Sequence, residues 1–232
     1  MLRLMTSVLL TLCFGVLLNS AVFYFLKDFR ESAQKFAGMI VFTICFQGAV
    51  VVWIHCFLRD ERITWTEGFG FCNRPARALA WGLGIGAVAL PVTLGLSHLS
   101  AEILTRAGIK PVMQEAVQRL QEGPGSFQQA FLGIVAIFMA PLAEELLFRG
   151  IIYPTIRQAG YPRLALWGTS VMFAAIHMNL AAFVPLTIFA LILTWAYEQT
   201  NNLLAPMLIH GLFNAVNFLF IIFSNEIQRV FE

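Results

Sequence analysis

Apolar residues dominate this chain in long runs, which short polar turns separate. Seven runs approach the ~20 residues that an α-helix needs to cross the hydrocarbon core of a bilayer. The fifth and sixth runs are short, so the pattern predicts about seven transmembrane helices, within a range of six to eight. The runs cover residues 4–26, 36–58, 80–101, 127–152, 164–178, 181–197 and 203–223.

Composition supports the same fold class. Of the 232 residues, 59% are hydrophobic and 12% are charged, whereas soluble domains carry about 25% charged residues. The first run has no small-residue cleavage site, so we expect it to be retained as a span rather than removed as a signal peptide. We therefore predict an all-α, polytopic membrane helical bundle, an integral multi-pass protein.

Charged residues are distributed unevenly among the spans. The spans before residue 102 contain no Asp, Glu, Lys or Arg, which indicates scaffold helices. The segment PVMQEAVQRLQ, residues 111–121, predicts a short helix at the membrane interface, for which we favour a connector over a substrate gate. We interpret residues 1–126 as N-terminal scaffold helices with this connector, and residues 127–224 as the core that carries the candidate chemistry.

Three charged residues interrupt the fourth apolar run: Glu144, Glu145 and Arg149. A charge at the centre of a bilayer costs roughly 2.5 to 3.5 kcal/mol on the insertion scale, so the run must contain partners that offset this cost. Residues four apart share a helical face, which predicts an ion pair between Glu145 and Arg149. Glu144 is rotated by about 100° from its neighbour and stays unexplained by that pair.

Two later spans repeat the four-residue spacing with polar side chains. The sequence FAAIH places Phe173 four residues before His177, and HGLFN places His210 four residues before Asn214. A single histidine or asparagine in a span is often a hydrogen-bonding contact between helices. A carboxylate, two imidazoles and an amide converging from three helices are instead typical of a site.

The depths of these residues agree in part. If the chain turns at Gly160, then Glu144 lies 16 residues before the turn and His177 lies 17 residues after it. In an antiparallel pair the two side chains meet at nearly the same depth. His210 lies closer to its own turn at residues 201–202, so its depth agrees if the first hairpin protrudes or the helices tilt.

Three motifs in this order carry a resemblance to a known family. EELLFR, FAAIH and HGLFN fit EExxxR, FxxxH and HxxxN, and residues 127–220 resemble the CPBP family of intramembrane proteases. That family includes type II CAAX prenyl endopeptidases and proteins of bacteriocin processing and self-immunity. The resemblance implies an endopeptidase that acts in or beside the membrane, with residues 127–224 as its catalytic core.

The resemblance also implies roles for the individual residues. Glu144 and His177 would activate a water molecule, and His210 with Asn214 would stabilise the oxyanion. Residue chemistry agrees, because a carboxylate can serve as general base and imidazole and amide N–H groups can donate to a developing negative charge. The supporting residues are Glu145, Arg149 and Phe173.

A metal-dependent mechanism is the alternative chemistry within the same family. A catalytic zinc needs three protein ligands and an open position, and Glu144, His177 and His210 would supply the ligands. Asn214 is a poor zinc ligand and a good oxyanion donor. We therefore favour catalysis without a metal or other cofactor, and keep zinc as the alternative.

Two other classes of function compete with the endopeptidase. One is a binding or bacteriocin self-immunity protein that acts without proteolysis, and the other is an ion or proton carrier. The complete polar set favours catalysis, and the first three spans lack the ionisable residues of a carrier path. We expect two partners, the lipid bilayer and a hydrophobic peptide or membrane-protein substrate, in a bacterial or archaeal cell membrane. The net charge of +2 with scattered basic residues does not favour nucleic acid.

Overall fold

The structure is a computed structural model that describes residues 2–111, 118, 120 and 125–231. The described residues form helices joined by short turns, with no strand among them, which confirms the all-α prediction. They divide into two compact units, Met1–Gly68 and Phe69–Glu232. The interfacial helix predicted for residues 111–121 lies largely outside the described residues, and the division of roles at residue 126 stays a prediction.

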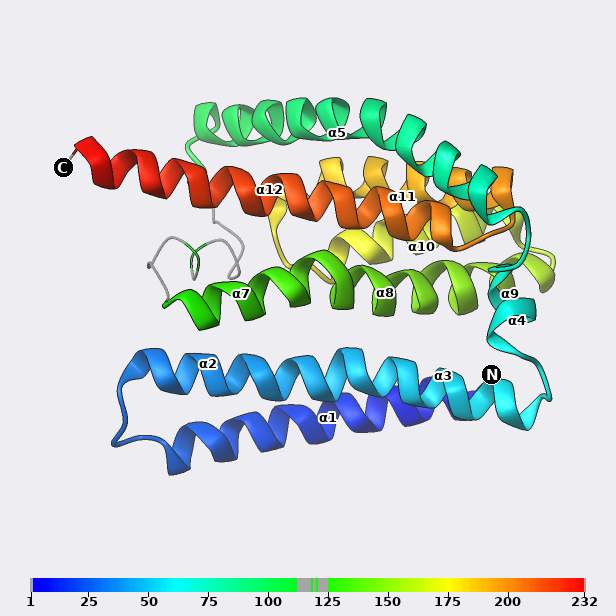
Figure 1. The fold of residues 1–232 in the computed structure, drawn as a ribbon, viewed down its shortest axis with the longest axis horizontal. Helices are drawn as coiled ribbons and strands as arrows, with labels where there is room; N and C mark the ends of the chain where they lie inside the picture. Colours follow the sequence, from blue (N-terminus) through cyan, green and yellow to red (C-terminus); the bar gives the residue numbers. More distant parts are fainter. Residues whose placement is uncertain (1, 112–117, 119, 121–124, 232) are drawn as a thin grey trace. The chain divides into compact units, whose positions relative to one another are not determined.

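The first unit is a helical hairpin (Figure 1). Its second arm contains a wide π-helical turn, η1, where Gly15 of the first arm approaches so closely that an added Cβ would lie 2.5 Å from the Cβ of Cys45. Trp53 Nε1 donates to Thr11 Oγ1 at 2.9 Å between the arms. The elements are α1 (Leu2–Phe25), α2 (Glu31–Phe42), η1 (Thr43–Gly48) and α3 (Ala49–Asp60), and α4 (Trp65–Phe69) follows them.

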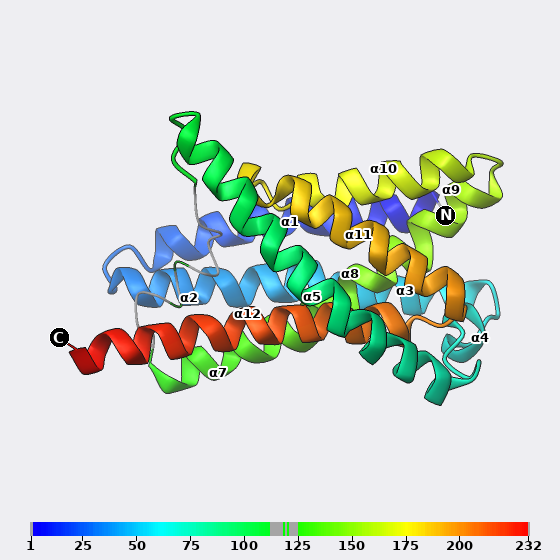
Figure 2. The same ribbon diagram turned by 90° about the horizontal axis from the view of Figure 1, so that it is seen from above.

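The second unit holds every candidate site residue. In Figures 1 and 2, α5 lies across α11 and α12, and the segments α7 to α9 follow one another as a single long helical rod with two π-helical turns. The elements are α5 (Pro75–Arg106), α7 (Ser126–Ile134), η2 (Val135–Met139), α8 (Ala140–Glu145), η3 (Leu146–Ile152), α9 (Tyr153–Gln158), α10 (Pro162–Ala175), α11 (Leu180–Thr200) and α12 (Leu204–Phe231).

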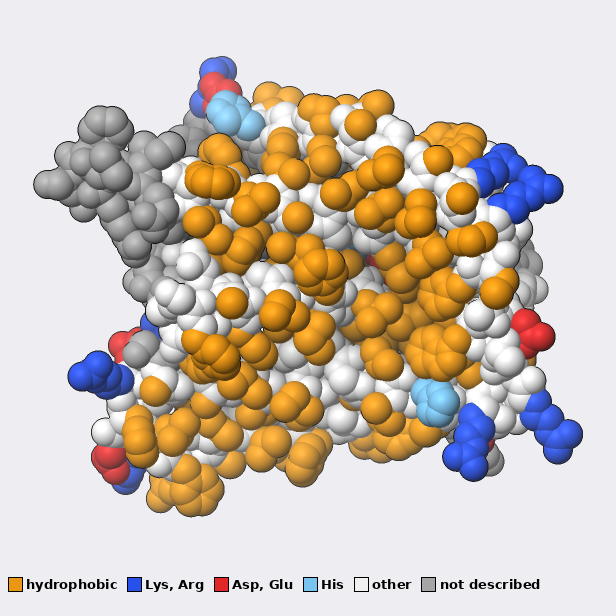
Figure 3. All heavy atoms as spheres, viewed as in Figure 1, with side chains coloured by type: hydrophobic (Ala, Val, Ile, Leu, Met, Phe, Trp, Pro, Cys, Tyr) orange, Lys and Arg blue, Asp and Glu red, His pale blue; other side chains and the backbone are white. Residues whose placement is uncertain are grey.

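Six helices among the described residues are long and apolar enough to cross a membrane, which lies within the predicted range. The fifth predicted run, residues 164–178, forms α10, whose 14 residues reach about 21 Å at 1.5 Å per residue and so fall short of the ~30 Å hydrocarbon core. In each unit, the charged side chains visible in Figure 3 gather near the helix ends, and hydrophobic side chains cover the stretch between them. The protein is an integral membrane protein.

Small residues let α5 approach its neighbours. Gly82 and Gly86 form a G-x-x-x-G pattern, which allows close contact between membrane helices, and an added Cβ on Gly82 would lie 3.2 Å from the carbonyl oxygen of Ala205. Beside this contact lies a buried apolar cluster that joins α5, α11 and α12. Its members are Ala89, Phe189, Leu193, Ala196 and Ile209.

Two turns fix the order of the helices in the second unit. The predicted turn at Gly160 is confirmed, with the glycine at φ +93° between α9 and α10. Between α11 and α12, the Asn202 side chain accepts from Leu204 N at 2.9 Å and donates to Asn73 O at 3.0 Å. The end of α11 and the starts of α5 and α12 are therefore tied together.

Candidate active site

A buried ion pair lies at the centre of the second unit. Arg149 Nη1 and Glu145 Oε1 are 2.9 Å apart, and both side chains are almost fully buried, so the predicted pair is present. Arg149 also donates to Ala190 O at 2.9 Å and to Thr194 Oγ1 at 3.4 Å, both on α11. The guanidinium lies 4.9 Å from the centre of the Phe173 ring. A buried cation held by several partners in this way is tolerated, because its polar groups are satisfied.

His210 of α12 stands between the two glutamates. Its Nδ1 lies 2.9 Å from Glu145 Oε1, and its Nε2 lies 3.9 Å from Glu144 Oε2. Glu145 therefore has two partners, Arg149 and His210, of which the sequence predicted only the first. The imidazole is further enclosed by the rings of Phe173 and Phe189, with centroids 5.7 and 5.6 Å away.

Glu145 uses only Oε1 for Arg149 and His210, and its Oε2 has no hydrogen-bond partner among the described residues. Glu144 faces the same cluster. Within the described part of the chain, its Oε2 atom is buried and has no hydrogen-bond partner. Its Oε2 lies 3.9 Å from His210 Nε2, beyond hydrogen-bond distance. Buried polar atoms without a partner are uncommon in native proteins and often mark functional sites. The ion pair does not use this residue, as the helical spacing predicted.

His177 lies in the turn that follows α10, where its ring packs against Phe173 with centroids 5.0 Å apart. We expected this helix to run to residue 178, but it ends at Ala175, because Asn179 caps the start of α11 by accepting from Ala182 N at 3.0 Å. The His177 Nδ1 atom lies 2.7 Å from Phe173 O. Since a carbonyl oxygen can only accept, Nδ1 carries the proton and Nε2 is left as an acceptor.

Asn214 contacts the backbone of the helical rod rather than another side chain of the set. Its Nδ2 atom donates to Ala136 O at 2.8 Å, within the π-helical turn η2. Nearby, Pro141 has no N–H to donate to the carbonyl of Ile137 four residues earlier. That carbonyl faces Gly211, where an added Cβ would lie 3.0 Å from the oxygen. Helix α12 therefore packs closely against the irregular backbone around residues 136 and 137. This close packing brings His210 and Asn214 next to the helical rod.

Comparisons with known proteins agree with this arrangement. The profile of the family described as Type II CAAX prenyl endopeptidase Rce1-like matches residues 126–216. The UPF0177 protein YxdF of Lactococcus lactis subsp. lactis (strain IL1403) is 34% identical over 158 residues, which cover 66% of this chain and 84% of YxdF. This chain belongs to the CPBP family. The resemblance carried by the three motifs is thereby confirmed.

A second relative matches over a shorter stretch. The protein YpbD of Bacillus subtilis (strain 168) is 33% identical over 87 residues, which cover 36% of this chain and 42% of YpbD. No solved structure matches the chain significantly. The family is one of intramembrane CAAX-type proteases, so the buried polar cluster is its candidate active site.

The residues proposed as metal ligands do not form a complete set in this structure. Within the described residues, no three His, Cys, Asp or Glu side chains lie close enough together to hold one ion. Glu144 Oε2 and His210 Nε2 face each other at 3.9 Å, but a catalytic zinc needs a third protein ligand. The zinc set of Glu144, His177 and His210 therefore stays a prediction.

Two residues of α11 support the site without having been predicted. Thr194 receives a hydrogen bond from Arg149, and Phe189 packs its ring edge-on against His210. Both are fully buried. In the sequence they lie in an apolar run that contains no charge, so no local signal distinguished them from residues that face lipid.

Proposed function

We propose that this CPBP protein is an intramembrane endopeptidase that hydrolyses a peptide bond in a membrane-associated peptide or protein. The observation that carries the proposal is the Glu144 carboxylate, which faces His210, has one buried oxygen without a hydrogen-bond partner among the described residues and, unlike Glu145, is not paired with Arg149. A general base needs a free carboxylate oxygen within reach of the proton that it takes. The family membership supports the same reaction.

In the proposed first step, Glu144 takes a proton from a water molecule while the water oxygen attacks the carbonyl carbon of the scissile bond. In its neutral form, His177 accepts a hydrogen bond at Nε2 from the other O–H of this water and so orients it. The tetrahedral intermediate carries the negative charge on the former carbonyl oxygen. In the second step Glu144 returns the proton to the leaving amide nitrogen, and the C–N bond breaks.

The oxyanion is stabilised by N–H donors on α12. His210 Nδ1 is held by Glu145 Oε1 at 2.9 Å, whereas its Nε2 lies 3.9 Å from Glu144 Oε2, beyond hydrogen-bond distance, and is the ring nitrogen that we assign to the oxyanion. Asn214 uses one amide hydrogen for Ala136 O and retains a second for the oxyanion. Glu145 acts as a positioning residue, because it holds the His210 ring.

We further propose that the substrate is a hydrophobic peptide or a segment of a membrane protein, that the bilayer is the second partner, and that no nucleic acid takes part. Both relatives are bacterial, which supports a bacterial cell membrane as the location. The apolar surroundings of the site, with Phe173 and Phe189 beside it, suit an apolar substrate.

The proposed function predicts new protein termini that depend on Glu144. Terminal proteomics compares membranes of cells that express the parent with membranes of cells that express Glu144→Gln. A synthetic peptide that spans the cleaved bond is then incubated with the purified protein. We expect cleavage by the parent that persists in a strong chelator. Loss of cleavage in chelator, restored by zinc, would assign a metalloprotease. No new terminus with either protein would favour a binding or self-immunity role.

Asn214→Ala is expected to lower turnover by about 10² to 10³, the usual effect of removing one oxyanion donor, with little change in substrate binding. Asn217→Ala is the matched control, because Asn217 lies nearly one turn further along α12 and donates to Phe213 O of its own helix. Steady-state kinetics on the peptide give kcat and KM for both. Unchanged turnover in Asn214→Ala would reduce this residue to a contact between helices.

Gly211→Ala is expected to lower turnover about tenfold without altering any functional group. The added Cβ would lie 3.0 Å from Ile137 O, so α12 must move outward, and small displacements of catalytic groups are costly. Gly95→Ala on α5 is the control, since an added Cβ there meets no atom within 4 Å. Equal turnover in the two variants would show that the position of α12 is not critical.

A further inference from the structure

A polar pocket lies where α5 begins and α11 ends, away from the candidate active site. Its volume is roughly 210 Å³, and its lining includes Asn73, Arg74 and Arg77 from one side and Gln199 and Asn201 from the other. Within the part of the chain that the structure describes, neither arginine has a carboxylate partner. Two hydrogen bonds beside the pocket connect the start of α5 to the end of α11. Asn73 Nδ2 donates to Thr200 O, and Asn202 Nδ2 donates to Asn73 O.

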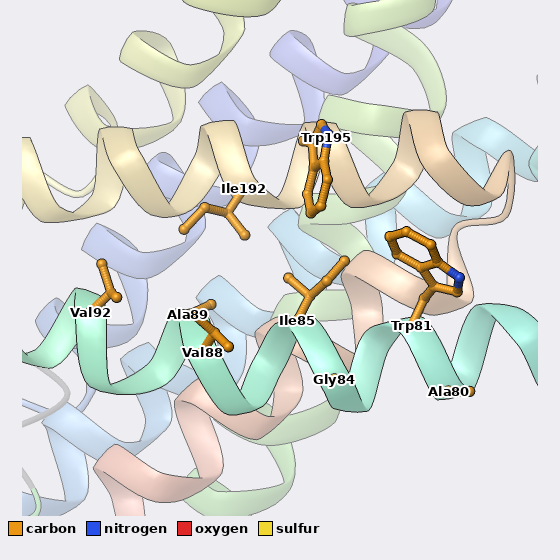
Figure 4. A pocket seen from close by; sticks show the side chains of 9 residues that line it. All are labelled: Ala80, Trp81, Gly84, Ile85, Val88, Ala89, Val92, Ile192 and Trp195. Atoms are coloured by element: carbon orange, nitrogen blue, oxygen red, sulfur yellow. The ribbon is translucent and has the colours of Figure 1, made fainter.

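An apolar groove continues from this pocket along the same two helices. Figure 4 shows Trp81 and Ile85 of α5 reaching toward Trp195 of α11, with Ile192 further along. The volume of the groove is roughly 620 Å³. Its α5 side follows one helical stripe that starts at the pocket, and the stripe consists of Arg77, Trp81, Ile85, Val88 and Val92. The polar pocket and the groove therefore form one elongated surface with a basic end and an apolar body.

The dimensions of the groove match one leaflet of a bilayer. From Trp81 to Val92 the α5 axis advances by about 16 Å at 1.5 Å per residue, and half of the hydrocarbon core is about 15 Å thick. The rings of Trp81 and Trp195 contact each other edge-on at 6.0 Å, next to the basic end. Tryptophan is enriched at this level, where the polar headgroups meet the hydrocarbon core.

We infer that this surface binds one anionic phospholipid, with its phosphate between Arg74 and Arg77 and an acyl chain in the groove between α5 and α11. Basic pockets between membrane helices recognise anionic headgroups in this way, and guanidinium groups form strong hydrogen bonds to phosphate. The positive end of the dipole of α5 lies at the same place. The lipid site does not depend on the proposed peptidase activity.

The first test measures which lipid the purified protein retains. The protein in detergent is exposed to equal amounts of dioleoyl phosphatidylglycerol and dioleoyl phosphatidylcholine, and bound lipid is counted by native mass spectrometry. An arginine near an anionic headgroup contributes about a fivefold preference, so two predict roughly 25-fold for phosphatidylglycerol. Arg74→Gln with Arg77→Gln should abolish the preference, and the control Arg163→Gln, an exposed arginine near the start of α10, should retain it.

The second test fills the apolar part of the surface. Gly84 lines the groove, and an added Cβ there meets no atom within 4 Å, so Gly84→Leu should occupy the groove and also favour the helix. It should lose both lipids, whereas Gly95→Leu, on the same helix and also in open space, should not.

Four outcomes would overturn the lipid site. They are equal retention of the two lipids by the parent, a preference for phosphatidylglycerol that persists in the double arginine variant, unchanged retention in Gly84→Leu, and competition by glycerol 3-phosphate at the concentration of the lipid. Competition by glycerol 3-phosphate would indicate a site for free anions. Loss of peptide cleavage in Gly84→Leu, with lipid retention unchanged, would indicate that the groove binds the substrate.

Discussion

Glu144→Gln is expected to abolish proteolysis while leaving the melting temperature unchanged or higher. A general base contributes about 10² to 10⁴ to the rate, and glutamine has nearly the same shape but cannot take the proton. The ion pair of Glu145 and Arg149 does not involve this side chain, and its Oε2 atom lacks a hydrogen-bond partner among the described residues. The substitution therefore removes a charge from a costly position, and the contact between helices that it alters, with His210 at 3.9 Å, is longer than a hydrogen bond.

Peptide turnover and the melting temperature in detergent are measured for the parent and for Glu144→Gln. Substrate binding by Glu144→Gln should stay close to that of the parent, because the base acts in the transition state rather than in binding. A variant that retained near-parental turnover would show that Glu144 is not the base. A variant that unfolded would show that Glu144 supports the fold.

Glu145→Gln and Arg149→Gln are each expected to destabilise the protein strongly. Removing one partner of a buried ion pair costs roughly 3 to 5 kcal/mol, which corresponds to a fall of about 6 to 20 °C in melting temperature for a chain of this size. Arg149 would keep its bonds to Ala190 O and Thr194, and Glu145 would keep its contact with His210. Since each loss consists mostly in leaving the other partner unpaired, the double variant should cost less than the sum of the two singles.

The control for this pair has the same spacing on the surface. Glu31 and Lys35 lie 2.9 Å apart on α2 with both side chains exposed, and exposed pairs contribute about 0 to 1 kcal/mol. Glu31→Gln should therefore leave the melting temperature nearly unchanged. Additive losses in the buried pair, or a fully stable Glu145→Gln, would contradict the structural role. Glu145→Gln should also lower turnover in the fraction that stays folded, because the His210 ring loses its partner.

Local chemistry in the sequence accounts for much of the fold. The ion pair of Glu145 and Arg149 was predictable because residues four apart on a helix are neighbours whatever surrounds them. The turn at Gly160 was predictable because glycine adopts the positive φ that the turn requires. The end of α10 was predicted three residues too late, although Asn179 is a common helix-capping residue and offered the signal.

The length and hydropathy of the apolar runs indicated which residues lie in spans, but not which side chains from different spans contact each other. The sequence by itself determined the class of fold and the number of spans within one, and through three motifs in order it predicted the set of Glu144, His177, His210 and Asn214. These features depend on spacing along the chain, so they can be read from it. The roles of the four residues stay predictions until the variants are measured.

Only the tertiary structure decided how the helices are rotated and how closely they approach. The contact of His210 with Glu145 joins residues 65 positions apart, and Asn214 donates to a backbone carbonyl that the irregular turn near Pro141 leaves available. Backbone carbonyls are the same at every position, so a sequence does not show which of them faces a neighbour. Which face of α12 meets the rod depends on the packing of Gly211 against Ile137 O, and packing is a property of the whole assembled unit rather than of any one span.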